Sequence, residues 1–316
     1  MDTPLQSSTT AHAMRRRWTG YVLVLLAGSF WACLGIFFTW LKNYNIPPTA
    51  IALNRALVSG LTLLVVMLVR NPAALRFKLR DTPYFVIYSI GIALFFLVYV
   101  EAVNKGGVAL ASVLLYTAPV WVVLFAWLRW HEPLTPFKII ALLLAVLGSA
   151  LVALGAGTSQ TSGGTWAITL GLLSGVAYAA YSLLSNEGLR RGYQPITIVM
   201  IVMLMTAVWL VPFQDWNAVQ RALTTPATWM PLLGVGWVSS LLAPVCYAAG
   251  QQRIGASTAG ILATVEPVLA AILAWLIFNE RLTVMQMIGG MCVLIAVLVI
   301  AQATSKPKGH SHDELT

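Results

Sequence analysis

Residues 107–135 read GVALASVLLYTAPVWVVLFAWLRWHEPLT, and residues 255–283 read GASTAGILATVEPVLAAILAWLIFNERLT. The two stretches align without a gap at an offset of 148 residues, and the alignment continues to residue 151 in the first copy and to residue 299 in the second. Twelve of these 45 positions are identical, and each copy has the same proline, the same Trp-Leu pair and the same glutamate. Shared hydrophobicity alone does not produce matches of such residue types, so we infer an internal repeat.

The repeat extends beyond these two stretches. The further matches are Tyr99 with Tyr247 at an offset of 148 and, at an offset of 147, Gly28 with Gly175, Trp31 with Tyr178 and Pro48 with Pro195. We therefore predict two copies of one five-helix unit, at residues 20–154 and 165–302. A linker rich in Gly, Ser and Thr at residues 155–164 joins them, and tails at residues 1–19 and 303–316 flank them.

Composition identifies the class of protein. Of the 316 residues, 59% are hydrophobic and only 9% are charged, and the mean hydropathy is +0.82. Soluble domains carry roughly 25% charged residues, so this composition excludes a water-soluble globular protein. Apolar runs of the ~20 residues that one helix needs to cross a bilayer recur along the chain, without the alternating pattern of a membrane β-barrel. The predicted fold class is all-α membrane, with ten transmembrane helices at residues 20–40, 49–69, 83–103, 107–128, 134–154, 165–185, 195–213, 229–250, 255–277 and 283–302.

The 19 basic residues predict the orientation, because Lys and Arg near short loops stay cytoplasmic. With ten spans and a cytoplasmic N-terminus, 14 of them fall on the inner side, four on the outer side, and Arg55 inside a span. Both termini are therefore expected in the cytoplasm. The first apolar run follows three arginines, but bulky Phe30 and Trp31 argue against cleavage as a signal peptide. The positive charge is scattered over loops and forms no patch, so nucleic-acid binding is not expected.

Each copy has an odd number of helices, so the second copy must cross the membrane in the opposite direction. Inverted repeats are a recurring architecture of secondary transporters, with the substrate site near the midplane between the halves. The motif of Gly, mid-helix Pro, Trp-Leu, and Glu followed by Leu-Thr, once per half over ten helices, resembles the EamA-type members of the drug/metabolite transporter superfamily. Within it, the chain is most similar to the bacterial aromatic amino-acid exporters. The resemblance covers roughly residues 18–302 and implies ten helices around a central cavity, in a bacterial inner membrane, that export metabolites.

Prolines occur at equivalent places in the two halves. Pro119 and Pro267 each lie twelve residues after the glycine that opens their predicted helix, close to the middle of the span. A proline there removes a backbone hydrogen bond and kinks the helix, which frees the carbonyls of Leu115 and Ala263 at midplane. The bends either only shape the bundle or line a cavity, and their recurrence favours the cavity. These two prolines and Pro244 are the candidate kink or gating positions.

Two charged residues lie deep inside predicted spans. Glu266 is the only such acid, and burying a carboxylate there costs about 2.5–3.5 kcal/mol on insertion scales, so it must be paired, hydrated or protonated. It could receive a substrate ammonium, carry a proton, or accept structural hydrogen bonds. Arg55, seven residues after Pro48, could bind a substrate carboxylate, snorkel outward, or pair with a helix end. EamA-type proteins often have these residue types here whatever their substrate, so the resemblance favours a shared structural role for Glu266 and leaves the role of Arg55 open.

Hydroxylated aromatic and small residues follow helical spacing in spans 1, 3, 4, 6 and 8. Such stripes suit a pocket for a largely apolar ligand or close helix packing, and their occurrence in five spans favours a pocket. Spans 5 and 10 are nearly featureless and are expected to be peripheral scaffold. The predicted substrate-binding residues are Trp31, Arg55, Tyr99, Ser112, Tyr116, Tyr178, Tyr181, Trp237, Ser240, Tyr247 and Glu266.

The other titratable residues do not indicate catalysis. The four histidines lie in loops or tails, the three cysteines lie inside spans, and no P-loop, H-E-x-x-H or G-x-S-x-G motif occurs. We therefore expect no enzyme activity, no metal, no cofactor and no primary ATP-driven transport by this chain alone. An ion channel is disfavoured because one deep acid cannot form a ring of charges. Glu101, at the outer end of the third predicted span, is expected to pair with Lys105 four residues on as a structural cap. Glu132 and Glu280 also end predicted helices and are expected to fix loops.

The sequence thus predicts a multi-pass secondary transporter that exports amino acids, aromatic and other largely neutral ones among them, or related metabolites, by alternating access. The alternative is a broad exporter of drugs or cationic compounds, with or without proton coupling, for which Glu266 would be essential. The expected partners are a small-molecule substrate and the lipid bilayer, and the expected unit is a monomer. Proton exchange and facilitated diffusion are both compatible with the sequence.

Overall fold

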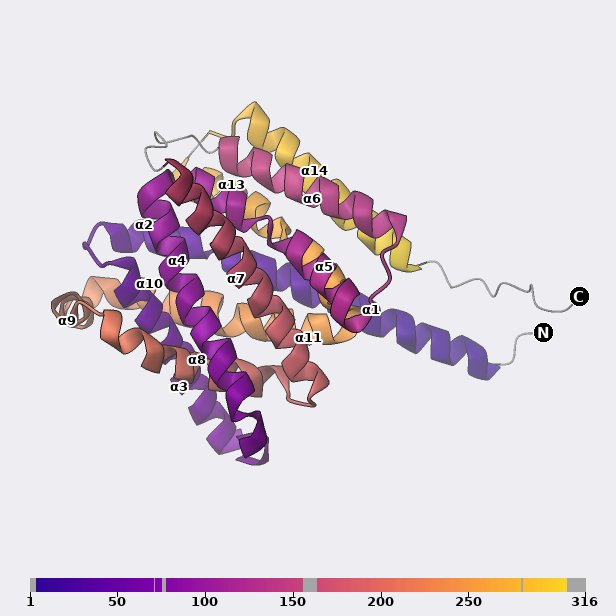
Figure 1. Ribbon diagram of the computed structural model, residues 1–316, viewed down its shortest axis with the longest axis horizontal. Helices are drawn as coiled ribbons and strands as arrows, with labels where there is room; N and C mark the ends of the chain where they lie inside the picture. Colours follow the sequence, from indigo (N-terminus) through magenta and orange to yellow (C-terminus); the bar gives the residue numbers. More distant parts are fainter. Residues whose placement is uncertain (1–3, 71, 76–77, 156–163, 280, 306–316) are drawn as a thin grey trace, which may run out of the picture.

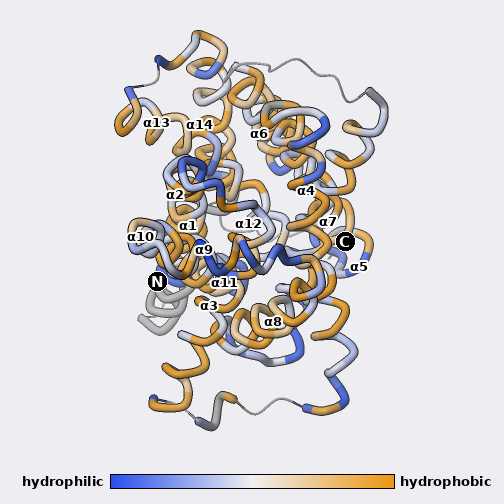
Figure 2. Tube along the Cα trace, turned by 90° about the vertical axis from the view of Figure 1, so that its left-hand side faces the viewer, coloured by the Kyte–Doolittle hydropathy of each residue, from blue (hydrophilic) through white to orange (hydrophobic). Residues whose placement is uncertain are grey.

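The computed structural model describes residues 4–70, 72–75, 78–155, 164–279 and 281–305. Ten segments of this part of the chain are long and apolar enough to cross a membrane, which confirms the predicted number of spans. Short hydrophilic segments separate long hydrophobic runs along the helices (Figure 2). The ten spans are Met14–Lys42, Pro48–Arg70, Leu79–Val108, Leu110–Trp130, Pro136–Gly155, Gly164–Arg190, Pro195–Phe213, Pro226–Ile254, Ala256–Phe278 and Val284–Gln302.

Several spans contain more than one helix. The first contains most of α1 and all of α2, the fourth contains the end of α4 and all of α5, the eighth contains α10, η4 and α11, and the ninth contains α12 and α13. The helices (Figure 1) are α1 (Pro4–Ala32), α2 (Leu34–Lys42), α3 (Pro48–Arg70), α4 (Thr82–Leu115), α5 (Ala118–Trp130), α6 (Pro136–Gly155), α7 (Gly164–Arg190), α8 (Pro195–Leu210), α9 (Trp216–Thr224), α10 (Pro226–Gly234), α11 (Ala243–Ile254), α12 (Ala256–Ala263), α13 (Val265–Phe278) and α14 (Val284–Ser305). The short turns are η1 (Pro72–Leu75), η2 (Leu79–Asp81) and η3 (Val211–Phe213), whereas η4 (Val235–Leu242) is a π-helix.

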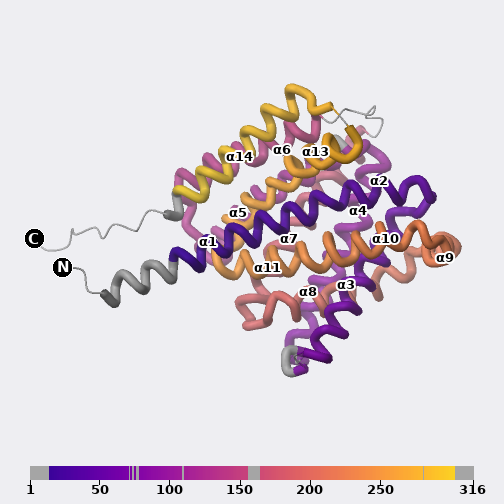
Figure 3. Tube along the Cα trace, turned by 180° about the vertical axis from the view of Figure 1, so that it is seen from behind, coloured from indigo at the N-terminus to yellow at the C-terminus, as the bar shows by residue number. Residues whose placement is uncertain are grey.

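The fifth and tenth spans, α6 and α14, lie side by side along one edge of the molecule (Figures 1 and 3). Their backbones meet at two glycines. A Cβ added to Gly148 would lie 2.6 Å from the carbonyl oxygen of Gly289, and a Cβ added to Gly289 would lie 2.5 Å from that of Gly148. Thr283, just before α14, donates a hydrogen bond of 3.1 Å to the carbonyl of Gly155, the last residue of α6, so the two helices run antiparallel. Their position at the edge fits the scaffold role predicted for these spans.

Unusual backbone conformations recur at the offset of the sequence repeat. Gly107 has φ 78° and ψ 163°, and Gly255 has φ 84° and ψ 164°, a region that essentially only glycine adopts. His131 and Asn279 both follow the end of a helix in the left-handed conformation, with φ 53° and 54°. Each pair is 148 residues apart, so the two halves of the chain turn at equivalent positions.

Contacts between helix ends show which ends share a face of the bundle. Gly20 of α1 lies against Arg253 of α11, and the start of α4 lies against the end of α7 through a hydrogen bond of 2.7 Å from Tyr84 to the carbonyl of Leu184. The described N-terminal end of α1 and the C-terminal end of α14 lie at the same end of the molecule (Figures 1 and 3). These helix ends carry basic residues, Arg15 in α1, Arg80 just before α4, Arg190 in α7 and Arg253 in α11, and we refer to this face as the basic face. The sequence predicts it to be cytoplasmic.

Glu132 occupies a structural position on that face. Its carboxylate accepts hydrogen bonds from the backbone N–H groups of Ala256 at 3.0 Å and Ser257 at 3.2 Å, and it forms an ion pair of 3.6 Å with Lys138. Glu132 therefore caps the N-terminus of α12, where the helix dipole stabilises a negative charge. Its repeat counterpart Glu280 lies outside the described residues, as do residues 156–163 of the linker and residues 306–316 of the C-terminal tail.

Glu101 lies in α4 and forms an ion pair of 3.6 Å with Lys105, one turn further along the helix. Between the seventh and eighth spans the chain also contains a helix, α9, that the sequence analysis did not predict. Asp215 caps it by accepting hydrogen bonds from the backbone N–H groups of Asn217 and Ala218 at 3.0 and 3.3 Å. A helix of nine residues is marginal by itself in water, and tertiary packing stabilises it.

Candidate functional site

The helices of the fourth and ninth spans are interrupted near the middle of the span. Each interruption lies just before one of the prolines at which the sequence predicts a kink. Pro119 is the second residue of α5, and Pro267 is the third residue of α13. A proline in the first turn of a helix loses no hydrogen bond, because the N–H groups there have no partner within the helix. Each proline therefore begins a half-helix in the interior of the bundle.

A glycine from a neighbouring helix lies against each interruption. A Cβ added to Gly175 of α7 would lie 2.7 Å from the carbonyl oxygen of Leu114 in the last turn of α4, and a Cβ added to Gly28 of α1 would lie 2.6 Å from the first side chain of α13. Trp31 follows Gly28 by three residues, and Tyr178 follows Gly175 by three residues. Helical spacing puts each ring on the same face as its glycine. The matched glycines therefore bring two aromatic rings close to the two interruptions.

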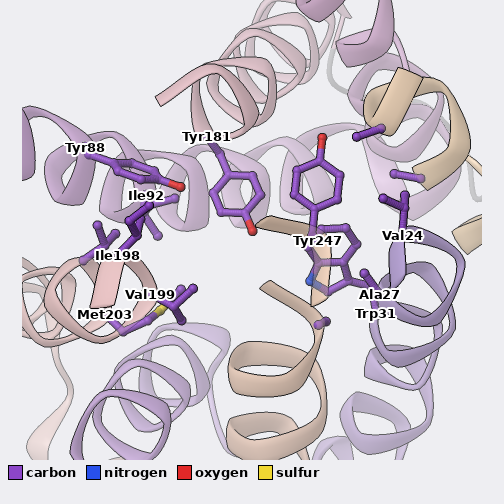
Figure 4. Close-up of a cluster of buried hydrophobic side chains, with 14 of the residues drawn as sticks. Val24, Ala27, Trp31, Tyr88, Ile92, Tyr181, Ile198, Val199, Met203 and Tyr247 are labelled. Atoms are coloured by element: carbon purple, nitrogen blue, oxygen red, sulfur yellow. The ribbon is translucent and has the colours of Figure 1, made fainter. Parts of the chain in front are cut away.

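Four aromatic residues from three helices pack together, and we refer to Trp31, Tyr178, Tyr181 and Tyr247 as the ring cluster. The ring centroid of Trp31 lies 5.3 Å from that of Tyr247, 6.1 Å from that of Tyr178 and 6.2 Å from that of Tyr181. Tyr178 and Tyr181 stack at 5.9 Å with an interplanar angle of 3°, and Tyr181 stacks on Tyr247 at 6.0 Å. Figure 4 shows Tyr181 between Tyr88 on one side and Tyr247 and Trp31 on the other.

Hydrogen bonds orient one side of the ring cluster. The hydroxyl oxygens of Tyr247 and Ser182 are 2.6 Å apart, within hydrogen-bond distance. Gln251 donates from Nε2 to the carbonyl of Ser182 at 2.9 Å and to its hydroxyl at 3.1 Å. These bonds tie α11 to α7 within the buried core. The Tyr247 ring is consequently fixed by its hydroxyl as well as by packing.

Helix α4 adds a second aromatic group. Phe95 stacks on Tyr178 with a centroid distance of 5.6 Å and lies 6.2 Å from Tyr99. The hydroxyl of Tyr99 is 3.3 Å from that of Ser112. Gly107 lies between these two residues in the sequence, and its turn allows the later part of α4 to lie near Tyr99. Phe95 thus connects the Tyr99 and Ser112 pair to the ring cluster.

Arg55 is in the interior of the second span, on α3. Its Nε donates a hydrogen bond of 2.8 Å to the hydroxyl of Ser240 in η4, and its guanidinium carbon lies 4.4 Å from the ring centroid of Phe96 in α4. Within the described part of the chain, its two terminal nitrogens make no hydrogen bond. The positive charge is therefore stabilised by one hydroxyl and one aromatic face, and four N–H donors are left for another group.

Glu266 is the second residue of α13 and is half-buried. It interacts electrostatically with Arg55 and with the hydroxyl groups of Tyr99, Tyr116 and Tyr178. No ion pair within 4.0 Å joins Glu266 to Arg55, and among the described residues Glu266 makes no hydrogen bond. Within the described part of the bundle interior, one basic and one acidic side chain thus act on each other without direct contact.

The family follows from comparison with known proteins. The family model described as the EamA-like transporter family matches residues 18–154 and, a second time, residues 165–302. The chain belongs to this family. It is therefore a membrane transporter, in agreement with the resemblance noted in the sequence.

The chain is also similar to two curated transporters and to one solved structure. An uncharacterized transporter from Archaeoglobus fulgidus is 31% identical over 72% of this chain and 81% of its own length. The pseudopaline exporter CntI from Pseudomonas aeruginosa is 26% identical over 76% of this chain and 82% of its own length. A solved crystal structure with 17% sequence identity has a TM-score of 0.75 and covers 94% of this chain and 99% of that chain, which shows a shared fold.

Trp237 is the predicted site residue that the structure does not place with the others. Its side chain is 45% exposed, and its indole N–H donates to the hydroxyl of Thr62 on α3 at 3.0 Å. The prediction assumed regular α-helical spacing from Trp237 to Tyr247. Residues 235–242 instead form a π-helix, whose wider turn changes which residues share a face. Ser240, within the same segment, faces Arg55 as described above.

Two contacts of these candidate site residues were not predicted from the sequence. Ser182, which anchors Tyr247, lies four residues after Tyr178 and could have been found by extending the stripe on α7. Phe96, which packs on Arg55, gives no signal, because one apolar residue in an apolar span is not distinctive. In the described part of the chain, no three His, Cys, Asp or Glu side chains come together as metal ligands.

Proposed function

We propose that this EamA-family transporter exports amino acids, aromatic ones among them, from the cytoplasm across the bacterial inner membrane. The observation that carries the proposal is the pair formed by Arg55 and Glu266. Each is an ionisable side chain inside the membrane without a direct ionic partner among the described residues, and the two interact electrostatically. An uncompensated charge in a low-dielectric interior is costly. A zwitterion compensates both, with its carboxylate on Arg55 and its ammonium on Glu266.

The ring cluster supports an aromatic or largely apolar side chain on the substrate. Its rings come from α1, α7 and α11, and two of them have hydroxyl groups that are not fixed by Ser182. Pockets for small ligands combine such apolar walls with a few placed polar groups, here Ser112 and Ser240. In this structure the rings contact one another, so we infer that they separate when a substrate enters.

The two interrupted spans support alternating access. Short half-helices that begin at Pro119 and Pro267 can tilt against the long helices α1 and α7 at the glycine contacts. We propose that the two units at residues 20–154 and 165–302 are inverted repeats, so that equivalent motions open the site to either side of the membrane. Pro244, the second residue of α11 after the π-helix, would be a third hinge. The name of one relative, the pseudopaline exporter, supports export as the direction.

A broad exporter of cationic compounds is the second candidate. Glu266 favours it, because a half-buried carboxylate near three tyrosine hydroxyls is suited to a lipophilic cation as well as to an ammonium group. The two candidates differ in the use of Arg55, which would repel a cation and attract a carboxylate.

Replacement of Glu266 by Gln separates the candidates. In proteoliposomes, wild-type protein is expected to exchange labelled phenylalanine but not labelled tetraphenylphosphonium. The Glu266→Gln variant is expected to exchange phenylalanine about tenfold more slowly, because one hydrogen bond to a charged group is lost. Glu101→Gln, at an exposed ion pair, is the matched control and should behave as wild type.

The cationic exporter is favoured instead if wild-type vesicles exchange tetraphenylphosphonium and not phenylalanine, and Glu266→Gln abolishes that exchange. The same vesicles, with and without an imposed pH gradient, test energy coupling. Net phenylalanine flux that follows the pH gradient indicates proton exchange, whereas flux that depends only on the phenylalanine gradient indicates facilitated diffusion.

A further inference from the structure

A second candidate binding site lies away from the ring cluster, at the basic face of the bundle. It is a groove of about 630 Å³ formed by the start of α4, the end of α5 and the end of α7. Three arginines line it: Arg80 in η2, Arg129 in α5 and Arg191 just after α7. None of them takes part in the transport site described above. The groove is open to the surroundings, so its occupant comes from outside the protein.

The charges of the groove leave a positive excess. Arg191 is neutralised within the protein, by Asp81 at 2.7 Å and Glu187 at 3.0 Å. Partial burial acts to lower its pKa, but the hydrogen bonds to these two carboxylates raise the pKa above its ordinary value, so the guanidinium stays charged. Arg80 and Arg129 are exposed, and neither has an ion pair within 4.0 Å in the described part of the chain. Two arginines on different walls are thus available to an anion.

The apolar residues of the groove connect it to the lipid-facing surface. Ile87 of α4 and Phe125 of α5 line it and are 62% and 46% exposed. Each lies about one to two turns from the arginine on its own wall, towards the middle of the span. Trp130, at the end of the fourth span, also lines the groove, and its indole N–H has no acceptor among the described residues. The lining of the groove therefore changes from charged residues at the span ends to apolar residues further into the membrane.

The depth of the three arginines in the membrane agrees with this change from charged to apolar residues. Arg80 lies at the beginning of the third span, Arg129 at the end of the fourth, and Arg191 directly after the sixth. Span ends lie at the boundary between lipid head groups and acyl chains, where Arg and Trp side chains are favoured. Basic pockets between transmembrane helices at this depth are suited to anionic head groups.

We propose that this groove binds one anionic phospholipid, with its phosphate between Arg80 and Arg129 and an acyl chain along Ile87 and Phe125. A soluble phosphate compound shares the first contact and lacks the second, which is why the apolar walls favour the lipid. The bound lipid would join α4, α5 and α7 at one end. Since α5 is the half-helix that begins at Pro119, lipid occupancy would restrict its tilt.

The test is native mass spectrometry of delipidated full-length protein with added lipid. Wild-type protein is expected to retain one phosphatidylglycerol in preference to phosphatidylcholine. The double variant Arg80→Gln, Arg129→Gln is expected to bind phosphatidylglycerol about 30-fold more weakly, since each basic residue near the surface strengthens the binding about fivefold. Phosphatidylcholine binding should be unchanged. The double variant Arg15→Gln, Arg70→Gln removes two exposed arginines outside the groove and should bind like wild type.

Two results would overturn the proposal. One is equal retention of phosphatidylglycerol by wild type and by the groove variant. The other is binding of glycerol phosphate as tight as that of phosphatidylglycerol, which would make the groove a site for a soluble anion. Phe125→Ser provides a variant with both arginines intact, and it is expected to weaken phosphatidylglycerol binding and leave glycerol phosphate binding unchanged. Size-exclusion profiles identical to wild type show that each variant is folded.

Discussion

Arg55→Gln is expected to slow phenylalanine exchange in proteoliposomes about 100-fold, the largest loss of transport among single substitutions of the proposed site. A hydrogen bond to a charged group contributes about 1.5–3 kcal/mol, and the guanidinium presents two parallel donors to a carboxylate. Glutamine keeps a polar side chain that can still bond to Ser240, but it removes the charge. The measurement is the initial rate of labelled phenylalanine exchange at saturating and at low substrate concentration.

Two controls separate binding from folding. Arg55→Lys keeps the charge and loses the forked geometry, so an intermediate rate is expected. Arg70→Gln, at the exposed end of the same helix, should exchange phenylalanine like wild type. A structural role for Arg55 alone predicts a lower apparent Tm and a smaller folded fraction, with a normal rate per folded molecule. That pattern would contradict a role in substrate binding.

Gly148→Val is expected to give the largest loss of stability, by about 3 kcal/mol, because it overpacks a contact that cannot relax. The Cβ alone would lie 2.6 Å from the carbonyl oxygen of Gly289, and a backbone atom cannot move without separating α6 from α14. The two γ-methyl groups of valine increase the clash. For a protein of this size we expect the apparent Tm in detergent to fall by about 6 °C or to be lost together with expression.

Gly91→Val is the matched control for this substitution. Gly91 also lies inside a transmembrane helix, and a Cβ there would meet no atom within 4 Å. The control is expected to unfold within about 1 °C of wild type, since a change without a clash alters stability by only a few tenths of a kcal/mol. An equal Tm for the two variants would show that α6 and α14 do not pack through these glycines.

The sequence was sufficient to predict the ten spans and the helix faces that several aromatic residues share. A membrane span needs only an apolar run of sufficient length, which can be read directly from the sequence. For this reason ten spans were predicted, and ten are present in the described part of the chain. Tyr178 and Tyr181 are three residues apart, and a regular helix puts them on one face, where they stack. The interruptions before Pro119 and Pro267 follow from the chemistry of proline.

Other features depend on information that local patterns lack. The π-helix at residues 235–242 shifts the face of Trp237, and it depends on how η4 packs against its neighbours. The hydrogen bond between Arg55 and Ser240 joins residues 185 positions apart. It forms because α3 packs against η4, and this packing is part of the tertiary structure. Residue spacing along one helix cannot predict which faces of two distant helices meet.

The central claim is that Arg55 and Glu266 together bind a zwitterion, and binding of three related compounds to purified protein tests it most directly. Phenylalanine carries both charges, phenethylamine only the ammonium, and 3-phenylpropionate only the carboxylate. We predict that phenylalanine binds at least about tenfold more tightly than either analogue, because each missing charge removes one charge-assisted hydrogen bond. We also predict that Arg55→Gln eliminates the difference between phenylalanine and phenethylamine. If phenethylamine binds wild-type protein as tightly as phenylalanine does, Arg55 takes no part in recognition and the account is wrong.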